Sequence, residues 1–383
     1  MAIGHTRRQR PVSAPARPTD LLRLREAVAP YPSEPSDEQM AAELGIPLAR
    51  LVRFDMNTLG GGPLPAVVEA LAAYDPTRVV EYGDQSYARL RGAIQGATGV
   101  PAQRIIPGAG ADELIRLVTS MTVGPGDAVV IPTPTFAMFA VEARLAGARV
   151  VEVPRRRPSE WQRVEVIRAT AEATGARLVW LCSPNNPTGD MYGPEEIATL
   201  VEGLPAIVAI DAVYQELAEV GVGMPPEGGS LRPLQERFPN LLILRSLSKA
   251  YGLAGARVGY LVVPDALASR FDAARLPLSI GGPSEAAAIG ALSDVRAARV
   301  RLAEIVNERD RMFDAYGHLG WGVLVSHTNF LLVRPPDAAG TAALLLARGL
   351  PVRSYSSGPL VDWLRITVRA PAENDRLLEA LGG

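Results

Sequence analysis

A single lysine, Lys249, is the residue best suited to covalent chemistry in this sequence. It is the one lysine among 39 basic residues, and all the others are arginine. Arginine stays protonated and is a poor nucleophile, whereas a lysine amine can lose its proton and form a Schiff base. One amine kept in an arginine-only background therefore points to a reaction at Lys249. A surface lysine left by drift would have the same composition, and only the neighbouring residues argue against it.

The segments around Lys249 carry groups that bind anions. Ser246 and Ser248 precede it in a Ser-Leu-Ser-Lys segment, and Arg257 follows it by eight residues. A second segment, Gly-Ala-Gly-Ala-Asp-Glu at 108–113, opens a predicted helix. Small residues let a phosphate approach the backbone, and the free N–H groups at a helix start attract anions. Glycine-rich turns before helices are common, and this segment alone is a weak sign.

Alternating helices and apolar strands predict how these segments meet. Continuous apolar strands between helices indicate a mainly parallel sheet with helices on both faces, which is an α/β, three-layer αβα fold. Predicted strands lie at 104–107, 127–131, 149–153, 177–182, 206–210, 240–245 and 259–263, and predicted helices at 86–98, 111–121, 136–146, 161–174 and 194–201.

The unusual loops of the chain nearly all follow predicted strand ends. In parallel sheets ligands bind beyond the carboxyl ends of the strands. We therefore expect five loops to converge on one crevice. These loops are 108–112, 133–136, 183–189, 211–214 and 246–249.

Changes in composition and in the predicted pattern of helices and strands along the chain predict its domain organisation. The Arg- and Pro-rich residues 1–19 are expected to be a flexible tail, and residues 20–55 a segment that joins the small domain. Residues 56–275 form the large domain. Residues 276–383 form a smaller α+β domain, which a long helix at about 283–318 enters.

Composition excludes several classes of function. The 383 residues carry a net charge of −2, so no positive field points to nucleic acid. Cys182 is the single cysteine, which rules out an internal disulfide and fits a reducing cytoplasm. His5, His318 and His327 are too scattered to suggest a metal site. No apolar run reaches the length of about 18 residues that a membrane helix needs.

Five further segments, together with those around Gly110 and Lys249, form a series of motifs in a fixed order along the chain. They are Tyr-Gly-Asp starting at Tyr82, Thr-Phe ending at Phe136, Ser-Pro-Asn-Asn-Pro-Thr-Gly at 183–189, Asp-Ala-Val-Tyr at 211–214 and Trp-Leu-Arg-Ile-Thr-Val at 363–368. From about residue 45 to the C-terminus, the chain resembles the fold-type I pyridoxal-phosphate-dependent aminotransferases (class I/II). It is most similar to their histidinol-phosphate aminotransferase-like branch.

The resemblance implies a catalytic set around pyridoxal 5'-phosphate. Lys249 would hold this cofactor as a Schiff base and, once released, act as the base that moves the substrate α-proton. Asp211 would keep the pyridine nitrogen protonated, which makes the ring an electron sink. Tyr214 and Asn186 would contact the phenolic oxygen of the cofactor.

Other residues would bind the cofactor phosphate or stack on its ring. Phe136, which stands where the family usually has tyrosine, would stack on the pyridine, although a core phenylalanine is the alternative. Tyr82 would reach the phosphate in a neighbouring subunit, which implies a homodimer with shared sites. The remaining phosphate contacts would come from Gly110, Ala111, Asp112, Ser246, Ser248 and Arg257.

Two arginines and two asparagines are the expected substrate contacts. Arg365 would grip the substrate α-carboxylate through a bidentate pair. Arg353 matches a second family arginine that faces the substrate side chain, with a surface charge as the alternative. Asn57, at the substrate mouth, and Asn186 complete the set.

Several positions depart from the family pattern. The family's Asn-Glu-Asn-Pro is reduced here to Asn57, followed by Thr-Leu-Gly-Gly-Gly. Gly83 replaces a proline, Ala212 a glutamate, and Arg369 a glycine near the substrate arginine. The cofactor residues are complete while the substrate rim is altered, and therefore the fold alone does not identify the substrate.

Three functions are compatible with these residues. The first is a homodimeric, cytoplasmic aminotransferase that moves an amino group from an amino acid or amino-alcohol phosphate, histidinol-phosphate-like, to a 2-oxo acid such as 2-oxoglutarate. The second is a decarboxylase, lyase or cyclase of the same fold, threonine-phosphate decarboxylase-like or amino-acid cyclase-like. The third is a degenerate non-enzymatic domain, against which the complete cofactor set argues. We favour the first, with no metal, nucleic acid or membrane as partner.

Overall fold

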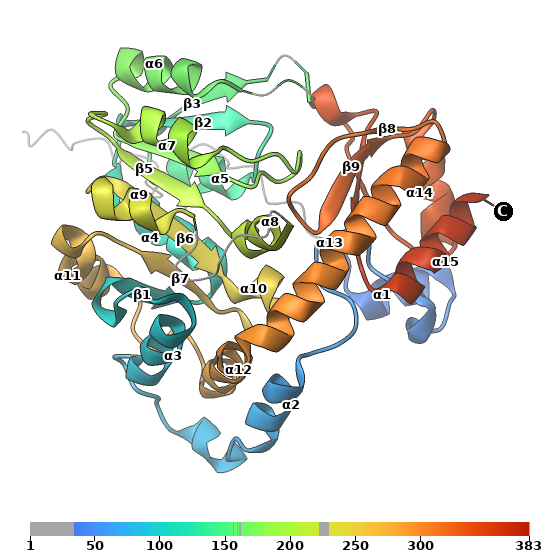
Figure 1. The fold of residues 1–383 in the computed structure, drawn as a ribbon, viewed down its shortest axis with the longest axis horizontal. Coiled ribbons are helices and arrows are strands. Elements are labelled where there is room, and N and C mark those ends of the chain that lie inside the picture. Colours follow the sequence, from blue (N-terminus) through green and yellow to red (C-terminus); the bar gives the residue numbers. More distant parts are fainter. Residues whose placement is uncertain (1–33, 156, 159, 161, 222–229, 383) are drawn as a thin grey trace, which may run out of the picture.

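The computed structural model describes residues 34–382 except 156, 159, 161 and 222–229. The tail expected at 1–19 therefore lies outside the described residues. The chain forms a large α/β part and a smaller α+β part, each built on its own sheet (Figure 1). This arrangement confirms the fold class predicted from the alternation of helices and apolar strands. The domain boundaries at 55/56 and 275/276 stay predictions.

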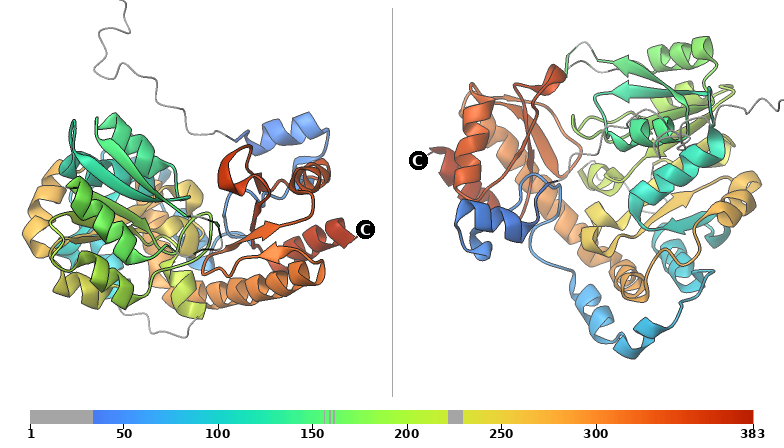
Figure 2. Two further views of the ribbon diagram at one scale, coloured as in Figure 1. Left: turned by 90° about the horizontal axis from the view of Figure 1, so that it is seen from above. Right: turned by 180° about the vertical axis from the view of Figure 1, so that it is seen from behind.

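A seven-stranded sheet is the centre of the large part, in the order β1-β7-β6-β5-β4-β2-β3. Strand β7 is antiparallel to both of its neighbours, and the remaining pairs are parallel. Helices cover both faces of the sheet (Figure 2), which is why its central strands β4 and β6 are buried along their whole length and mostly apolar. The strands are β1 (Ile105–Gly108), β2 (Ala128–Thr133), β3 (Arg149–Pro154), β4 (Leu178–Cys182), β5 (Ile207–Asp211), β6 (Leu241–Ser246) and β7 (Gly259–Val262).

The helices of the large part bury one apolar face each. Helix α4, for example, buries Leu114, Ile115 and Val118, whose spacing fits the helical period. Helix α7 has Pro194 at its first position, where proline is best tolerated. The helices are α2 (Pro65–Ala72), α3 (Ala88–Thr98), α4 (Gly110–Thr122), α5 (Met138–Leu145), α6 (Val164–Thr174), α7 (Pro194–Val201), α8 (Gln215–Gly221), α9 (Arg232–Arg237), α10 (Leu247–Ala250), α11 (Asp265–Ala274) and α12 (Gly282–Ser293).

A four-stranded antiparallel sheet forms the smaller part, in the order β10-β11-β9-β8. Its strands are β8 (Gly322–Val323), β9 (Phe330–Arg334), β10 (Arg353–Ser354) and β11 (Leu364–Thr367). Its helices are α1 (Asp37–Leu44), α13 (Val295–His318), α14 (Ala338–Ala347) and α15 (Pro371–Gly382). Helix α13 runs from the large part along the small sheet and connects the two (Figure 1).

The N-terminal segment is held against the C-terminal part of the chain. Phe54 forms an isolated parallel bridge with Val352, and the Val52 N–H donates to the Gly349 carbonyl at 2.9 Å. Phe54 is fully buried. The chain then passes from the small part to α2 in the large part, and residues 55–62 therefore lie where the two parts meet.

The single helix predicted at about 283–318 is wrong. The structure has two helices, α12 and α13, separated at Asp294. Asp294 leaves the helical region, with φ −126° and ψ 66°, and its carboxylate accepts a hydrogen bond from the Ala297 N–H at 2.9 Å. Aspartate competes for backbone N–H groups in this way and favours a helix start over a helix interior.

The described residues contain neither a membrane span nor a metal-ligand cluster. Among them no helix is long and apolar enough to cross a bilayer. No group of three or more His, Cys, Asp or Glu side chains in the same part of the chain could hold a metal ion.

We predict that the close contact of α12 with α2 tolerates no side chain at Gly290. A Cβ built there would lie 2.6 Å from both the Ala66 carbonyl oxygen and the Ala70 Cβ. Gly290→Val should lower the free energy of unfolding by about 1–3 kcal/mol, because an overpacked site forces the helices apart. Gly92→Ala in α3, where nothing lies within 4 Å of the added Cβ, is the control. Equal urea midpoints for Gly290→Val and the parent protein would contradict the prediction.

Candidate active site

Neighbouring parallel strands bring an acid and an amine to the same edge of the large sheet. Asp211 is the last residue of β5, and Ser246 is the last residue of the adjacent strand β6. Lys249 lies three residues further on, in the short helix α10. The parallel register places both strand ends at one edge, as the sequence predicted.

The amine of Lys249 lies beside backbone carbonyls of the segment 56–60, which we call the rim. Its Nζ donates to the carbonyl of Asn57 at 3.0 Å and, more weakly, to that of Met56 at 3.4 Å. Burial, together with the positive charges of Arg365 and Arg257, lowers the pKa of Lys249 from 10.5 to about 8. A larger fraction of the amine is therefore unprotonated near neutral pH than in an exposed lysine.

The carboxyl group of Asp211 is buried, with one hydrogen bond from the described residues. Its side chain is 3% exposed and accepts from the Val213 N–H at 3.2 Å. Burial raises the pKa of Asp211 from 3.8 to about 7, although this hydrogen bond and the charge of Lys249 oppose the rise. A buried carboxylate with so few partners is suited to pair with a cationic group of a ligand.

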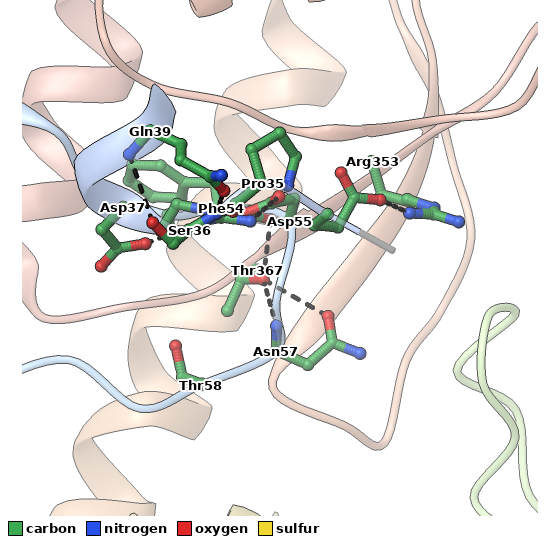
Figure 3. A network of polar contacts seen from close by, with 12 residues as sticks. Pro35, Ser36, Asp37, Gln39, Phe54, Asp55, Asn57, Thr58, Arg353 and Thr367 are labelled. Carbon is green, nitrogen blue, oxygen red and sulfur yellow. Dashed lines mark hydrogen bonds and ion pairs between the residues drawn. The ribbon is translucent and has the colours of Figure 1, made fainter. Parts of the chain in front are cut away.

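Asn57 links the lysine to Tyr214. Its side-chain amide donates to the Tyr214 hydroxyl at 3.0 Å, while its backbone carbonyl accepts from Lys249. Its own N–H donates to the Thr367 hydroxyl at 3.0 Å (Figure 3). Asn57 has φ 53°, a left-handed conformation that asparagine tolerates better than most residues. Burial raises the pKa of Tyr214 and keeps its hydroxyl protonated.

Arg365 on β11 faces the same region from the small sheet. It donates to the Asn186 side-chain oxygen at 2.7 Å and to the Asp55 carbonyl at 2.5 Å. Its Nε is buried and has no hydrogen-bond partner among the residues that the structure describes. The guanidinium lies 5.5 Å from the centre of the Phe330 ring. A buried guanidinium with an unused donor is suited to bind an anionic group such as a carboxylate.

A close approach of backbone and guanidinium forms a second positive region at the start of α4. Gly110 is the first residue of α4 and has φ 81°. A Cβ at this position would lie 2.6 Å from Nη2 of Arg257, and glycine is therefore required. Arg257 forms an ion pair with the Asp112 carboxylate at 3.0 Å. Ala111 and Asp112 follow Gly110 in the first turn, where backbone N–H groups lack helical partners.

Two serines add buried hydroxyls beside this region. Ser246 caps α10 by accepting from the Ser248 N–H at 3.2 Å, and the two hydroxyls lie 3.0 Å apart. Both side chains are buried. Their hydroxyls and Arg257 supply the donor types that phosphate groups require.

The structure gives three other predicted site residues different surroundings. Phe136 packs edge-on against Phe139, with ring centres 5.8 Å apart, and its stacking on a cofactor stays a prediction. Tyr82 is 90% exposed. Arg353 forms an ion pair with Glu34, a residue that the sequence did not single out.

Arg369 stabilises the rim through contacts that the sequence did not reveal. Its guanidinium donates to the Arg53 carbonyl and the Thr58 hydroxyl, both at 3.1 Å, and pairs with Glu373 at 2.8 Å. These contacts tie the side chain to the rim, and its closeness to the substrate arginine stays a prediction. Gly60 packs so closely on Glu373 that a Cβ would overlap it. The rim residues 58–60 are thus fixed from α15.

Two further polar residues support Asn57. Thr367 lies two positions after Arg365 on β11 and therefore on the same face, a signal that the quoted motif contained. Asn329 donates to the Asn57 carbonyl at 3.1 Å, and no periodicity or motif could have revealed it.

These groups fit pyridoxal 5'-phosphate. An amine of lowered pKa is available to react with an aldehyde, and a buried carboxyl group is available for a pyridine nitrogen. Ser246, Ser248, Arg257 and the start of α4 together offer the donors that a phosphate needs. The assignment of each residue to a part of the cofactor stays a prediction.

Comparison with known sequences decides the family. The profile of aminotransferase class I and II matches residues 49–381. The chain belongs to this family. Curated relatives include the histidinol-phosphate aminotransferase of Roseiflexus castenholzii, 37% identical over 96% of this chain and 99% of the relative. The enzyme of the same name from Symbiobacterium thermophilum is 36% identical over 92% of this chain and 95% of the relative.

Solved structures agree with this assignment to the class I and II aminotransferases. The histidinol-phosphate aminotransferase of Sinorhizobium meliloti, solved in complex with pyridoxal-5'-phosphate, superposes with a TM-score of 0.80 and 28% identity. The alignment covers 91% of this chain and 94% of that structure. The aminotransferase described here is thus a pyridoxal-phosphate-dependent enzyme of fold type I, as the motifs predicted.

We predict that Asp211 makes the stability of the cofactor-free aminotransferase depend on pH. Its pKa is raised from 3.8 to about 7 in the folded state, so the folded state retains a proton that the unfolded state has lost. The contribution of this group to stability therefore falls as pH rises from about 4 to about 7. Asp211→Asn should remove this pH-dependent loss of unfolding free energy, which is on the order of a few kcal/mol.

Urea unfolding between pH 5 and pH 8 measures this effect. The variant should gain stability over the parent protein as pH rises, with the largest gain above pH 7. A difference that is constant with pH would show that Asp211 ionises in the folded state as it does in the unfolded chain.

Proposed function

We propose that this aminotransferase moves an amino group from a histidinol-phosphate-like amino-alcohol phosphate, or a related amino acid, to a 2-oxo acid such as 2-oxoglutarate. The curated relatives of this name, at 36–37% identity over nearly the whole chain, support the donor class. The observation that carries the proposal is the pair of arginines on adjacent strands. Arg353 of β10 lies directly opposite Arg365 of β11, and together they can bind a donor with an anion at its far end.

Each residue of the site would have a separate role toward the cofactor or the substrate. When bound, the cofactor supplies a protonated ring that stabilises negative charge on the substrate α-carbon. Asp211 would pair with the ring nitrogen, and Tyr214, positioned by Asn57, would hydrogen-bond the phenolic oxygen together with Asn186. Lys249 would hold the cofactor and, once free, take and return the α-proton, a role that its pKa of about 8 suits.

Substrate orientation would depend on Arg365. Its contacts with Asn186 and the Asp55 carbonyl fix the guanidinium plane, and its Nε remains unused. The carboxylate of an amino-acid donor, or the phosphorylated hydroxymethyl arm that replaces it in L-histidinol phosphate, would be seated there. Asn57 borders this position through its contact with Thr367, the residue two places beyond Arg365.

Decarboxylation, elimination and cyclisation are less well supported than transamination. An L-threonine-O-3-phosphate decarboxylase from Porphyromonas gingivalis superposes with a TM-score of 0.72, but at 22% identity this likeness concerns the fold alone. Three relatives at 35–37% identity are histidinol-phosphate aminotransferases by name.

A homodimer in the cytoplasm is part of the proposal. Tyr82 is 90% exposed, and the preceding Val79 and Val80 are 66% and 84% exposed. An apolar, exposed segment of this kind is suited to cover a second copy of the chain. In such a dimer Tyr82 would reach the cofactor phosphate of the partner, and Gly110, Ala111 and Asp112 would meet it from their own chain.

The proposal predicts amine transfer from L-histidinol phosphate to 2-oxoglutarate. With added pyridoxal 5'-phosphate, the parent protein should form glutamate only when both substrates are present. Arg353→Ala should raise the KM for the phosphorylated donor at least about tenfold and change that for an unphosphorylated donor little, because a charge-assisted bond is lost. Lys249→Ala, which removes the single lysine of the chain, is the inactive control.

Stopped-flow absorbance of the bound cofactor measures the half-reaction with each donor. Reaction with unphosphorylated amines but not with L-histidinol phosphate would contradict the donor class. Release of carbon dioxide or ammonia without any need for a 2-oxo acid would favour the decarboxylase or lyase instead.

A further inference from the structure

The two arginines of the substrate region form an unusual like-charged pair. Arg353 and Arg365 are directly opposite each other in the antiparallel pairing of β10 and β11, and their side chains therefore lie on the same face. Like charges in this position repel unless anions lie between or beside them. Arg365 donates to neutral oxygens of Asn186 and Asp55, whereas Arg353 has an anion, the carboxylate of Glu34.

Glu34 is held in this position by the segment that follows it. Arg53 is 8% exposed, and its Nη1 donates to the Pro35 carbonyl at 3.0 Å and to the Asp37 carboxylate at 2.9 Å. Ser36 caps α1 through a reciprocal pair of hydrogen bonds with Gln39. Figure 3 shows this segment beside Arg353. The chain therefore presents the Glu34 side chain at a fixed place.

The same anchor connects Glu34 with the second arginine. The other edge of Arg53 binds both carboxylate oxygens of Asp55, at 2.7 and 2.8 Å. The carbonyl of Asp55 accepts from Arg365. One buried ion pair thus sets the position of Glu34 at Arg353 and that of the backbone oxygen at Arg365.

The Glu34–Arg353 pair can open without disrupting the core. The two side chains are 30% and 26% exposed, in contrast to the buried Arg53–Asp55 pair, whose side chains are 9% and 4% exposed. A half-exposed pair is worth little and exchanges with other anions, whereas breaking a buried pair is strongly destabilising.

We propose that Glu34 is a specificity-determining residue that occupies Arg353 as an internal substitute for the far anion of the substrate. A donor with an anionic end enters by displacing the Glu34 carboxylate. A donor with an uncharged end binds with Glu34 in place. The inference rests on the proposed function, because it assumes that Arg353 faces the bound donor, and it adds an internal competitor that selects among donors.

The test measures binding of ligands that lack an amine and cannot react. Cofactor-loaded parent protein, Glu34→Gln and Glu43→Gln are titrated calorimetrically with pentanoate, glutarate and 4-phosphonobutyrate. Glu43 lies in α1, which follows Glu34 in the chain, and is exposed, and its substitution removes the same charge nine residues away. Glu34→Gln should bind glutarate or the phosphonate about fivefold more tightly, with no change for pentanoate. The control should leave all three unchanged.

The outcomes separate this inference from the proposed function. If affinity for glutarate increases more, the preferred far anion is a carboxylate. If affinity for 4-phosphonobutyrate increases more, it is a phosphate. Unchanged or weaker binding of both two-ended anions to Glu34→Gln would overturn the inference, as would an equal gain for pentanoate or for the control. None of these probes is an amino donor, and failure of L-histidinol phosphate to react would therefore leave the binding result intact.

Discussion

Partial or complete loss of water around two ionisable groups, at or just beyond the ends of neighbouring parallel strands, is the constraint on which the rest of the site depends. Loss of water disfavours the charged forms of both Asp211 and Lys249, which moves their pKa values to about 7 and about 8. Roughly one amine in ten is then unprotonated at pH 7, compared with far fewer in an exposed lysine. The αβα layers create this environment, because loops at the carboxyl edge of the sheet are enclosed by helices and by the small part.

Hydrogen bonds of Asn57 fix the positions of the groups around Lys249. Asn57 has a hydrogen bond to Tyr214, to Thr367 and to the Lys249 amine, and thus joins groups from both sheets. Arg369 fixes the next residue, Thr58, from the small part. These long-range contacts hold the backbone beside the lysine.

Local sequence was sufficient for the fold and for the chemistry of the cofactor. The strands ending at Asp211 and Ser246 were predictable because buried parallel strands are continuous apolar runs. The break at Asp294 was missed because a capping aspartate within an Ala- and Arg-rich stretch changes the helical pattern little. The contacts of Glu34 with Arg353 and of Arg369 with Thr58 join positions about 300 residues apart, and such pairs leave no trace in spacing or periodicity.

The pKa of the Lys249 amine is the most direct test of this account. Because the chain has one lysine, labelling lysine with 13C at Cε gives a single resonance, which reports this amine without assignment. Titration of the cofactor-free protein by NMR should give a pKa of about 8. A value at the ordinary 10.5 would show that the amine is solvated, and would contradict the buried acid–amine site described here.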